Sequence, residues 1–275
     1  MNNNIIISVI ITTYNKPTYL KSVLLGFELQ NNRNFEIIIA DDGSNDETKQ
    51  LIESFSATSW MKIKQVWHED KGFRKCTILN KAILASETDY LLFTDDDCIP
   101  RPDFIDVHIK NAEKGRFLSG GYFKLNEVIT AKVTPDDIIR QHVFNIKWLV
   151  KNGQTMNFKL SKLSKCSAYT SFLNKFTTTK PTWNGHNVSG WKEDIMAVNG
   201  YNEDMMYGGL DRELGERLEN FGVHGKQIRY QAIVVHLDHG RPYRKKDLMD
   251  KNRAIRDAVK KQKIVWAENG LNQHR

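Results

Sequence analysis

Three consecutive aspartates, Asp95, Asp96 and Asp97, are the residues of this sequence whose type and spacing most clearly suggest chemistry. They follow the apolar run at 90–93, which predicts a buried strand. Ligands of open α/β sheets bind at the carboxyl ends of the strands, so this position favours a binding site. Adjacent buried carboxylates repel one another, and a divalent cation would remove that cost. Because hard oxygen ligands suit Mg²⁺ or Mn²⁺, the run predicts a metal site that holds a diphosphate.

Three further loops are expected at the same edge of the sheet. Residues 12–15 follow the first predicted strand, residues 41–44 follow the second, and residues 71–75 follow the third. Together these loops offer an aromatic ring, acids that can accept from a base or from ribose hydroxyls, and cations for phosphates. This combination fits a nucleoside diphosphate.

The elements that position these loops alternate along the first half of the chain. Apolar, β-branched runs predict strands at 5–12, 35–40, 63–67 and 90–94. Helical patterns lie between them, starting at Pro17, at a cap formed by Asn45 or Asp46, and at Thr77. This alternation predicts a parallel sheet with right-handed crossovers. In the second half we expect helices at 104–113, 210–221 and 245–262, strands at 117–124 and 228–235, and a loop or lid at 152–181.

The composition is that of a globular protein. The chain has 275 residues, of which 40% are hydrophobic and 27% charged. No apolar stretch approaches the roughly 20 residues of a membrane span, and the first residues lack the basic region of a signal peptide. The three cysteines, Cys76, Cys98 and Cys166, match neither a zinc pattern nor a disulfide framework. We therefore expect a cytoplasmic protein.

The net charge of +7 is concentrated near the end of the chain, because residues 241–263 hold 10 Lys/Arg against 3 Asp/Glu. Such a basic segment suggests peripheral attraction to an anionic membrane surface, although a solvated helix face is the simpler explanation. Arg241 and Arg244 in this segment could also reach phosphates. No basic stripe interleaved with aromatic residues is expected, so nucleic acid is not an expected partner.

The first half of the chain resembles the family 2 glycosyltransferases of the GT-A fold. The resemblance rests on residues 8–15, 41–44 and 95–97 in that order, and it covers roughly the first 125 residues. It implies an α/β fold with a Rossmann-like, mostly parallel sheet flanked by helices, in one domain. Residues 1–125 would form the nucleotide-sugar-binding half, residues 126–240 the acceptor-binding and catalytic half, and residues 241–275 a basic helix and tail.

This resemblance implies roles for individual residues on the donor side. Tyr14 and Asp42 would contact uracil, and Asp95 would contact the ribose. Asp97 would bind Mn²⁺ or Mg²⁺ as the last acid of a D-x-D motif, with Asp96 as the alternative ligand. A late histidine commonly completes this metal site, and His236 and His239 are the two candidates. The remaining donor-side candidates are Thr13, Asn15, Arg74 and Lys75.

The second half is similar to the C-terminal region of β-1,4-galactosyltransferases and chondroitin-type polymerases. The similarity rests on residues 187–194, 200–204 and 208–211, and it places Asp211 at the position of the catalytic base. Leu210 stands where that family has a glutamate, which leaves the acceptor sugar open. Asp211 also follows a Gly-Gly pair at a predicted helix start, where a carboxylate is favoured. The similarity implies acceptor contacts from Asn187, Trp191, Glu193, Asp194 and Gly209.

These resemblances imply a metal-dependent, inverting glycosyltransferase. It would move a hexose or N-acetylhexosamine from a UDP-sugar to a glycan or lipid-linked saccharide, forming a β-linkage. A bacterial-type surface polysaccharide or lipopolysaccharide is the implied product. Two alternatives stay open: a nucleotidyltransferase that acts on sugar phosphates, and a carbohydrate-binding protein without catalytic activity.

Overall fold

The computed structural model of the protein describes residues 6–240 and 246–275. Ile5, where the first strand was expected to begin, and the candidate phosphate contacts Arg241 and Arg244 lie outside the described residues. Among the described residues, no helix has both the length and the apolar character needed to cross a membrane.

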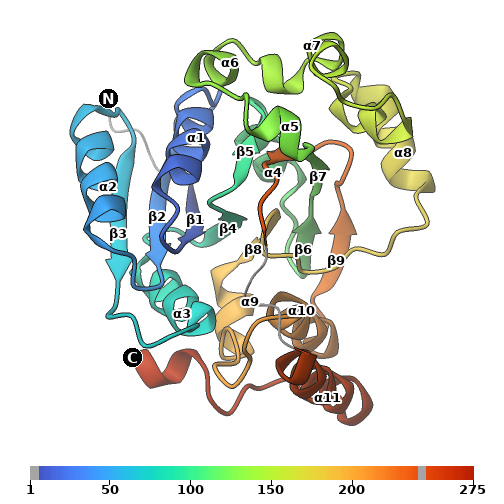
Figure 1. Ribbon diagram of the computed structural model, residues 1–275. Helices are drawn as coiled ribbons and strands as arrows, with labels where there is room; N and C mark the ends of the chain where they lie inside the picture. The colour runs from blue at the N-terminus through green and yellow to red at the C-terminus, as the bar shows by residue number, and fades with distance from the viewer. Residues whose placement is uncertain (1–5, 241–245) are drawn as a thin grey trace.

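A seven-stranded sheet forms the centre of the molecule, in the order β3-β2-β1-β4-β8-β6-β9 (Figure 1). The first four strands are parallel, which confirms the expected frame. They are β1 (Ile7–Thr13), β2 (Phe35–Asp41), β3 (Lys62–Trp67) and β4 (Tyr90–Asp95). The other half of the sheet is mixed, because β8 runs antiparallel to both β4 and β6, and β6 runs parallel to β9. These strands are β6 (Arg116–Ser119), β8 (Val188–Trp191) and β9 (His224–Gln227).

Helices cover both faces of this sheet. Val9 and Ile11 of β1 pack into the same core as α1 (Pro17–Glu28) and α2 (Asp46–Thr58), whereas Ile10 packs into the core formed with α3 (Lys75–Ala85). Adjacent residues of a strand point to opposite faces, so one buried strand serves both cores. The Asn45 side chain caps α2 by accepting a hydrogen bond from the Thr48 amide, as the sequence predicted.

A second sheet of three short strands lies beside the first, in the order β5-β10-β7. The prediction of one strand at 117–124 is wrong in one respect, because the segment divides at Gly120 into two strands, β6 and β7. A Cβ atom at Gly120 would lie 1.9 Å from Asn187 Oδ1, so this crossing point requires glycine. The strand predicted at 228–235 also starts later, since Ala232 donates to the Ile228 carbonyl in a turn. The three strands are β5 (Cys98–Pro100), β7 (Gly121–Lys124) and β10 (Ile233–His236).

The segment 152–181, expected to be a loop or lid, contains helical structure instead. It includes the 3-10 helix η2 (Phe158–Leu163) and the helix α8 (Ser167–Phe176). Its helical pattern is hard to see in the sequence, because Thr170 is the buried residue of α8 and the aromatic side chains point outward. The shorter neighbouring elements are α4 (Phe104–Asn111), α5 (Glu127–Thr130), α6 (Pro135–Ile139), η1 (His142–Phe144) and α7 (Ile146–Lys151).

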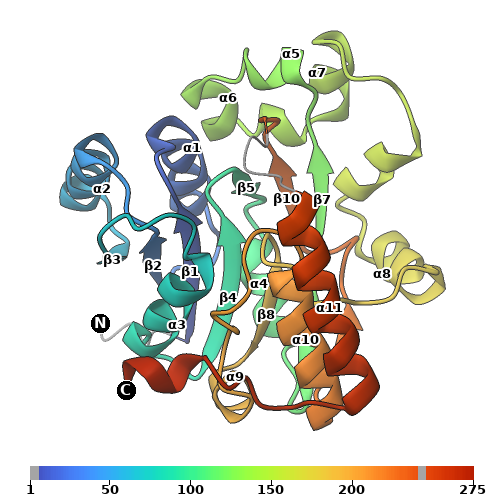
Figure 2. The same cartoon turned by 60° about the horizontal axis from the view of Figure 1, so that its bottom comes forward.

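The last helices complete the second face of the large sheet. The helix α10 (Leu210–Phe221) has the bounds predicted from the sequence, between Gly209 and Gly222, which both have positive φ angles. In Figure 2, α11 (Lys246–Gln262) runs alongside α10. The remaining elements are α9 (Lys192–Ala197) and η3 (Leu271–His274).

Candidate functional site

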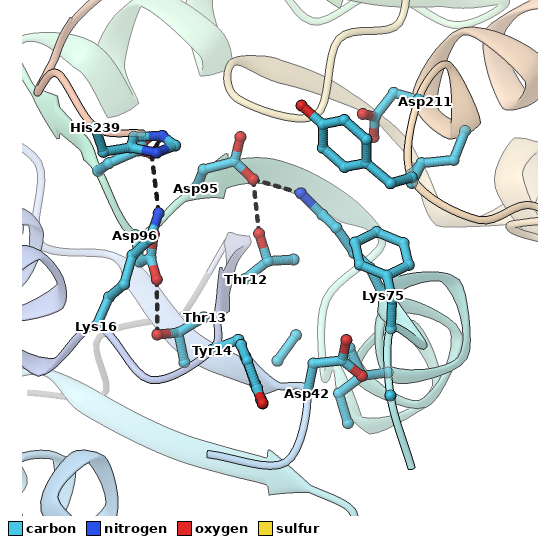
Figure 3. A pocket seen from close by; sticks show the side chains of 18 of the residues that line it. Thr12, Thr13, Tyr14, Lys16, Asp42, Lys75, Asp95, Asp96, Asp211 and His239 are labelled. Carbon is cyan, nitrogen blue, oxygen red and sulfur yellow. Dashed lines mark hydrogen bonds and ion pairs between the residues drawn. The ribbon is translucent and has the colours of Figure 1, made fainter. Parts of the chain in front are cut away.

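A pocket of about 490 Å³ lies at the carboxyl ends of β1, β2 and β4 (Figure 3). The start of α10 and the end of β10 close its other side, so both halves of the chain contribute to it. This is the edge at which the sequence predicted the four loops to meet. The residues that line the pocket and argue for a function are Thr12, Thr13, Tyr14, Lys16, Asp42, Lys75, Asp95, Asp96, Asp97, Gly209, Asp211, His236 and His239.

Tyr14 and Asp42 lie together on one side of the pocket. The Tyr14 hydroxyl donates a hydrogen bond of 2.8 Å to Asp70 Oδ2, while its ring is half exposed. Asp42 is buried, with Oδ1 2.7 Å from His68 Nε2 and Oδ2 accepting from the Arg74 amide at 3.0 Å. The exposed aromatic ring can stack on a nucleobase, and the fixed carboxylate beside it can accept a hydrogen bond from an N–H group of that base.

The three consecutive aspartates have different partners. Asp95 accepts hydrogen bonds from Thr12 Oγ1 at 2.7 Å and from Lys75 Nζ at 2.6 Å. Burial opposes ionisation of Asp95, but the Lys75 ammonium lowers its pKa below the usual value. Asp96 accepts from Thr13 Oγ1 at 2.9 Å, and burial raises its pKa to about 7. Asp95 is therefore held as the carboxylate of the pair.

Asp97 faces two histidines from the end of the small sheet. Its Oδ2 lies 2.7 Å from His239 Nε2, and its Oδ1 lies 3.6 Å from His236 Nε2. The β5–β10 register creates this cluster by pairing His236 with Cys98. Although burial raises the pKa of Asp97, the hydrogen bond with His239 and the nearby His236 lower it well below its usual value.

This cluster has the donor chemistry of a manganese site. The Nδ1 atoms of both histidines lie 2.7 Å from backbone carbonyls, of Leu237 for His236 and of Gly240 for His239. With Nδ1 held by a carbonyl, Nε2 faces Asp97, and on loss of its proton it would offer its lone pair to a metal, which is the usual arrangement of metal-bound imidazoles. Potential ligand atoms of Asp97, Cys98 and His236 also lie within 4.8 Å of one another. Burial raises the pKa of the Cys98 thiol, so Cys98 stays protonated and is a poor ligand for a hard cation.

Asp211 lies on another side of the pocket, in the first turn of α10. Gly208 and Gly209 precede it with φ angles of 105° and 86°, a conformation that favours glycine. Asp211 Oδ1 is buried against Gly185, where an added Cβ atom would lie 2.4 Å from it. Burial raises the pKa of Asp211 to about 6, partly offset by Lys75. A buried carboxylate that lines a pocket and has a pKa near neutrality suits a general base.

Two lysines line the pocket: Lys75, which was predicted as a phosphate contact, and Lys16, which was not among the predicted site residues. Burial lowers the pKa of Lys75, but the carboxylates of Asp95 and Asp211 raise it more, so Lys75 remains an ammonium. Lys16 Nζ lies 3.7 Å from both Asp96 and Asp97. The signal for Lys16 in the sequence is its place directly after the 12–15 loop, whereas Lys75 was predicted from the 71–75 loop.

Two of the predicted donor residues shape the site without lining the pocket. The Asn15 amide donates to Ser44 Oγ and Asn15 Oδ1 accepts from the Asn45 amide, so Asn15 joins the first two loops. The Arg74 guanidinium donates to the Glu69 carbonyl, away from the pocket, although the Arg74 amide binds Asp42. Of the two candidate phosphate contacts in the 71–75 loop, Arg74 and Lys75, only Lys75 is among the residues that line the pocket.

Four of the five predicted acceptor residues lie away from the pocket. Asn187 is fully buried, and its Nδ2 donates to the carbonyls of Gly121 and Ala232, so it fixes the junction of the two sheets. Trp191 pairs with Tyr90, at the opposite end of β4 from the pocket. Glu193 and Asp194 follow at that same far edge, because β8 runs antiparallel to β4. Gly209 alone lines the pocket.

The glycosyl transferase family 2 model matches residues 8–177, which is more than half of the chain. The chain belongs to this family. Two curated glycosyltransferases are similar over most of this chain. Validoxylamine A glucosyltransferase of Streptomyces hygroscopicus subsp. limoneus is 26% identical over 79% of this chain and 49% of its own length. Chondroitin synthase of Escherichia coli is 24% identical over 84% of this chain and 34% of its own length.

This family 2 glycosyltransferase therefore spans half or less of the length of these two relatives. Solved structures share its fold at lower identity. The mannosyltransferase PcManGT from Pyrobaculum calidifontis, in complex with GDP-Man and Mn²⁺, has a TM-score of 0.59 and 18% identity, covering 86% of this chain and 58% of that chain. S. aureus TarS 1-349 in complex with UDP-GlcNAc has a TM-score of 0.58 and 15% identity, covering 86% and 59%. The expected GT-A fold is confirmed.

Proposed function

We propose that this protein transfers a hexose or N-acetylhexosamine from a UDP-sugar to a hydroxyl of a glycan or lipid-linked saccharide, with inversion at the anomeric carbon. The observation that carries the proposal is that Asp211, a buried carboxylate whose pKa burial raises to about 6, lines the same pocket as Asp97 and its two histidines. Asp211 can remove a proton from the acceptor, while Asp97 and the two histidines, through a bound cation, would hold the leaving diphosphate. Synthesis of a surface polysaccharide or lipopolysaccharide fits this chemistry.

The donor half of the pocket supports a uridine nucleotide. Asp42, held by His68, would accept from the uracil N–H, and the half-exposed ring of Tyr14 would stack on the base. Asp95, kept ionised by Lys75, would accept from the ribose hydroxyls. The structural neighbour TarS 1-349, bound to UDP-GlcNAc, supports the same donor class.

Asp97, His236 and His239 would hold the divalent cation, and Mn²⁺ suits a mixed carboxylate and imidazole donor set. When bound, the cation neutralises the negative charge that develops on the departing UDP. The GDP-Man and Mn²⁺ complex of the mannosyltransferase PcManGT supports a metal in this fold. Lys16, 3.7 Å from Asp96 and Asp97, adds positive charge on the same side of the pocket.

The proposed reaction needs one proton transfer by the protein. Asp211 takes the proton of the acceptor hydroxyl while that oxygen attacks the anomeric carbon from the face opposite UDP. The bond from the anomeric carbon to the diphosphate oxygen breaks, and UDP leaves with the electron pair. Attack opposite the leaving group inverts the configuration, so a UDP-α-sugar gives a β-linkage.

The test is to incubate the protein with single UDP-sugars and Mn²⁺, with and without extracted glycolipid acceptors, and to identify the products by mass spectrometry. The proposal predicts free UDP and a product heavier by one sugar residue. Release of pyrophosphate would instead indicate a nucleotidyltransferase. Tight saccharide binding with no turnover of any UDP-sugar would indicate a binding protein.

A further inference from the structure

A long central segment of the chain carries charge of one sign only. Between Ile138 and Lys192 the sequence contains nine lysines or arginines and no aspartate or glutamate. Contrary to expectation, its basic residues are interleaved with aromatic ones, as in the run from Phe158 to Phe176. The basic residues are Arg140, Lys147, Lys151, Lys159, Lys162, Lys165, Lys175, Lys180 and Lys192.

Helix α8, within this segment, presents its polar side to the protein. Ser171 Oγ accepts a hydrogen bond of 2.8 Å from Gln231 Nε2, and Asn174 Oδ1 accepts one of 3.0 Å from the Tyr230 amide. Thr170, on the same side, is buried. A surface helix of a globular protein normally turns its apolar side inward. The orientation of α8 is the reverse.

The outer side of α8 is aromatic. Tyr169, Phe172 and Phe176 recur at helical spacing and are 39%, 56% and 64% exposed. The rings of Phe172 and Phe176 contact each other, with centroids 4.5 Å apart, so they form one apolar patch. Phe158 and Met156, which precede α8, are both 68% exposed. Figures 1 and 2 both show α8 at the outer edge of the molecule.

We propose that α8 and the residues around Phe158 dock on an anionic membrane surface. Aromatic side chains would enter the headgroup region, and the lysines around them would contact lipid phosphates. Lys159 and Lys175 are exposed and form no ion pair with any described residue, so their charge is available. A helix that projects from the edge of a molecule fits a flat bilayer, whereas single-stranded nucleic acid requires a charged groove.

This surface differs from the basic C-terminal helix. On α11, Arg256 and Lys260 both pair with Glu216 of α10, which neutralises part of that helix. The central segment has no acid of its own. Its aromatic patch has no counterpart among the described residues of α11. The buried residues of α11, Asn252 and Val259, face the protein. The proposal therefore places membrane contact on α8 rather than on α11.

Flotation with lipid vesicles tests this proposal. The protein of residues 1–275 is mixed with vesicles of phosphatidylcholine alone or with 30% phosphatidylglycerol, and the bound fraction is measured at low and high salt. The aromatic variant combines Phe158→Ser, Phe172→Ser and Phe176→Ser, and its control is Phe221→Ser, at an exposed phenylalanine of α10. The charge variant combines Lys159→Gln and Lys175→Gln, and its control on α11 combines Lys251→Gln and Lys261→Gln. Thermal unfolding and UDP binding check that every variant is folded.

The proposal predicts salt-sensitive binding to the anionic vesicles only. The aromatic variant should reduce the partition coefficient by roughly tenfold or more, and the charge variant by about tenfold, while both controls bind as the wild type does. Absence of vesicle binding by the wild type would overturn the proposal, as would loss of binding in the α11 control alone. Binding of an RNA oligomer, or a dimer in solution, that the aromatic variant abolishes without any vesicle binding would also overturn it.

Discussion

The ammonium of Lys75 lies 2.6 Å from Asp95 Oδ1, and its charge also acts on the buried carboxylate of Asp211. Lys75 therefore connects the donor half of the pocket, where Asp95 ends β4, with the catalytic half, where Asp211 begins α10. It keeps Asp95 ionised and limits the rise in the pKa of Asp211 to a value of about 6. The proposed ribose contact and the proposed base thus depend on one cation.

Replacing Asp211 with Asn should abolish most of the transfer and leave UDP affinity unchanged. The amide cannot take a proton, and general-base assistance contributes roughly 10²–10⁴-fold to rate. Steady-state kinetics together with calorimetry of UDP separate the two effects. Asp257→Asn, at an exposed acid on α11, is the control and should behave as the wild type does. An Asp211→Asn variant with normal turnover would remove Asp211 from the mechanism.

The activity should rise with pH through the pKa of Asp211. Because the proposed base acts as the carboxylate, kcat/KM should fall roughly tenfold per pH unit below about 6 and level off above it. Asp96, with a pKa of about 7, titrates nearby, so UDP affinity must be measured over the same range. If kcat/KM and UDP affinity fell in parallel with decreasing pH, the proposed role of Asp211 as the base would be contradicted.

The raised pKa of Asp211 also predicts that the substitution which removes activity increases the stability of the fold. A carboxyl group whose folded-state pKa is raised favours folding while protonated and opposes folding once ionised. At pH 8 wild-type Asp211 is ionised and desolvated, so Asp211→Asn should raise the melting temperature. At pH 5, between the usual value of 3.8 and the folded-state pKa of about 6, the gain should shrink to roughly half, and it should vanish only below pH 3.8. An equal shift at both pH values would show that packing, rather than charge, causes it.

Removal of the proposed metal ligands should remove the manganese dependence of UDP binding. Asp97→Ala should give the largest loss, because Asp97 faces both histidines. His236→Ala and His239→Ala should each weaken the effect of Mn²⁺, and the larger loss identifies the main imidazole ligand. His224→Ala, at an exposed histidine paired with Glu219, is the matched control. Full retention of the manganese effect in Asp97→Ala would exclude this metal site.

The sequence predicts the donor half of the fold well, because its signals are local. Buried strands such as β1 and β4 are continuous apolar runs, and α10 is bounded by Gly209 and Gly222. The meeting of the four loops at one edge follows from parallel strands alone. The metal cluster is less predictable, since His236 reaches Asp97 only through the pairing of β10 with β5.

The positions of the acceptor residues were predicted poorly, because the hydrophobic pattern of a strand does not show whether it runs parallel or antiparallel to its neighbour. The run that becomes β8 reads as a strand either way, but only its antiparallel pairing with β4 shows that Trp191 points away from the pocket. Asn187 resembles a ligand-binding polar residue, yet it joins the two sheets. The helix α8 was missed because its aromatic residues face outward, whereas a helical pattern is expected to mark a buried side.

Calorimetric titration of UDP into the purified protein, with and without Mn²⁺, tests the central claim most directly. The account predicts tight binding with Mn²⁺ and a large loss of affinity without it, because Asp97 and its histidines would hold the diphosphate only through the cation. Absence of UDP binding under both conditions would contradict the account, and the aspartates of the pocket would then have a structural role.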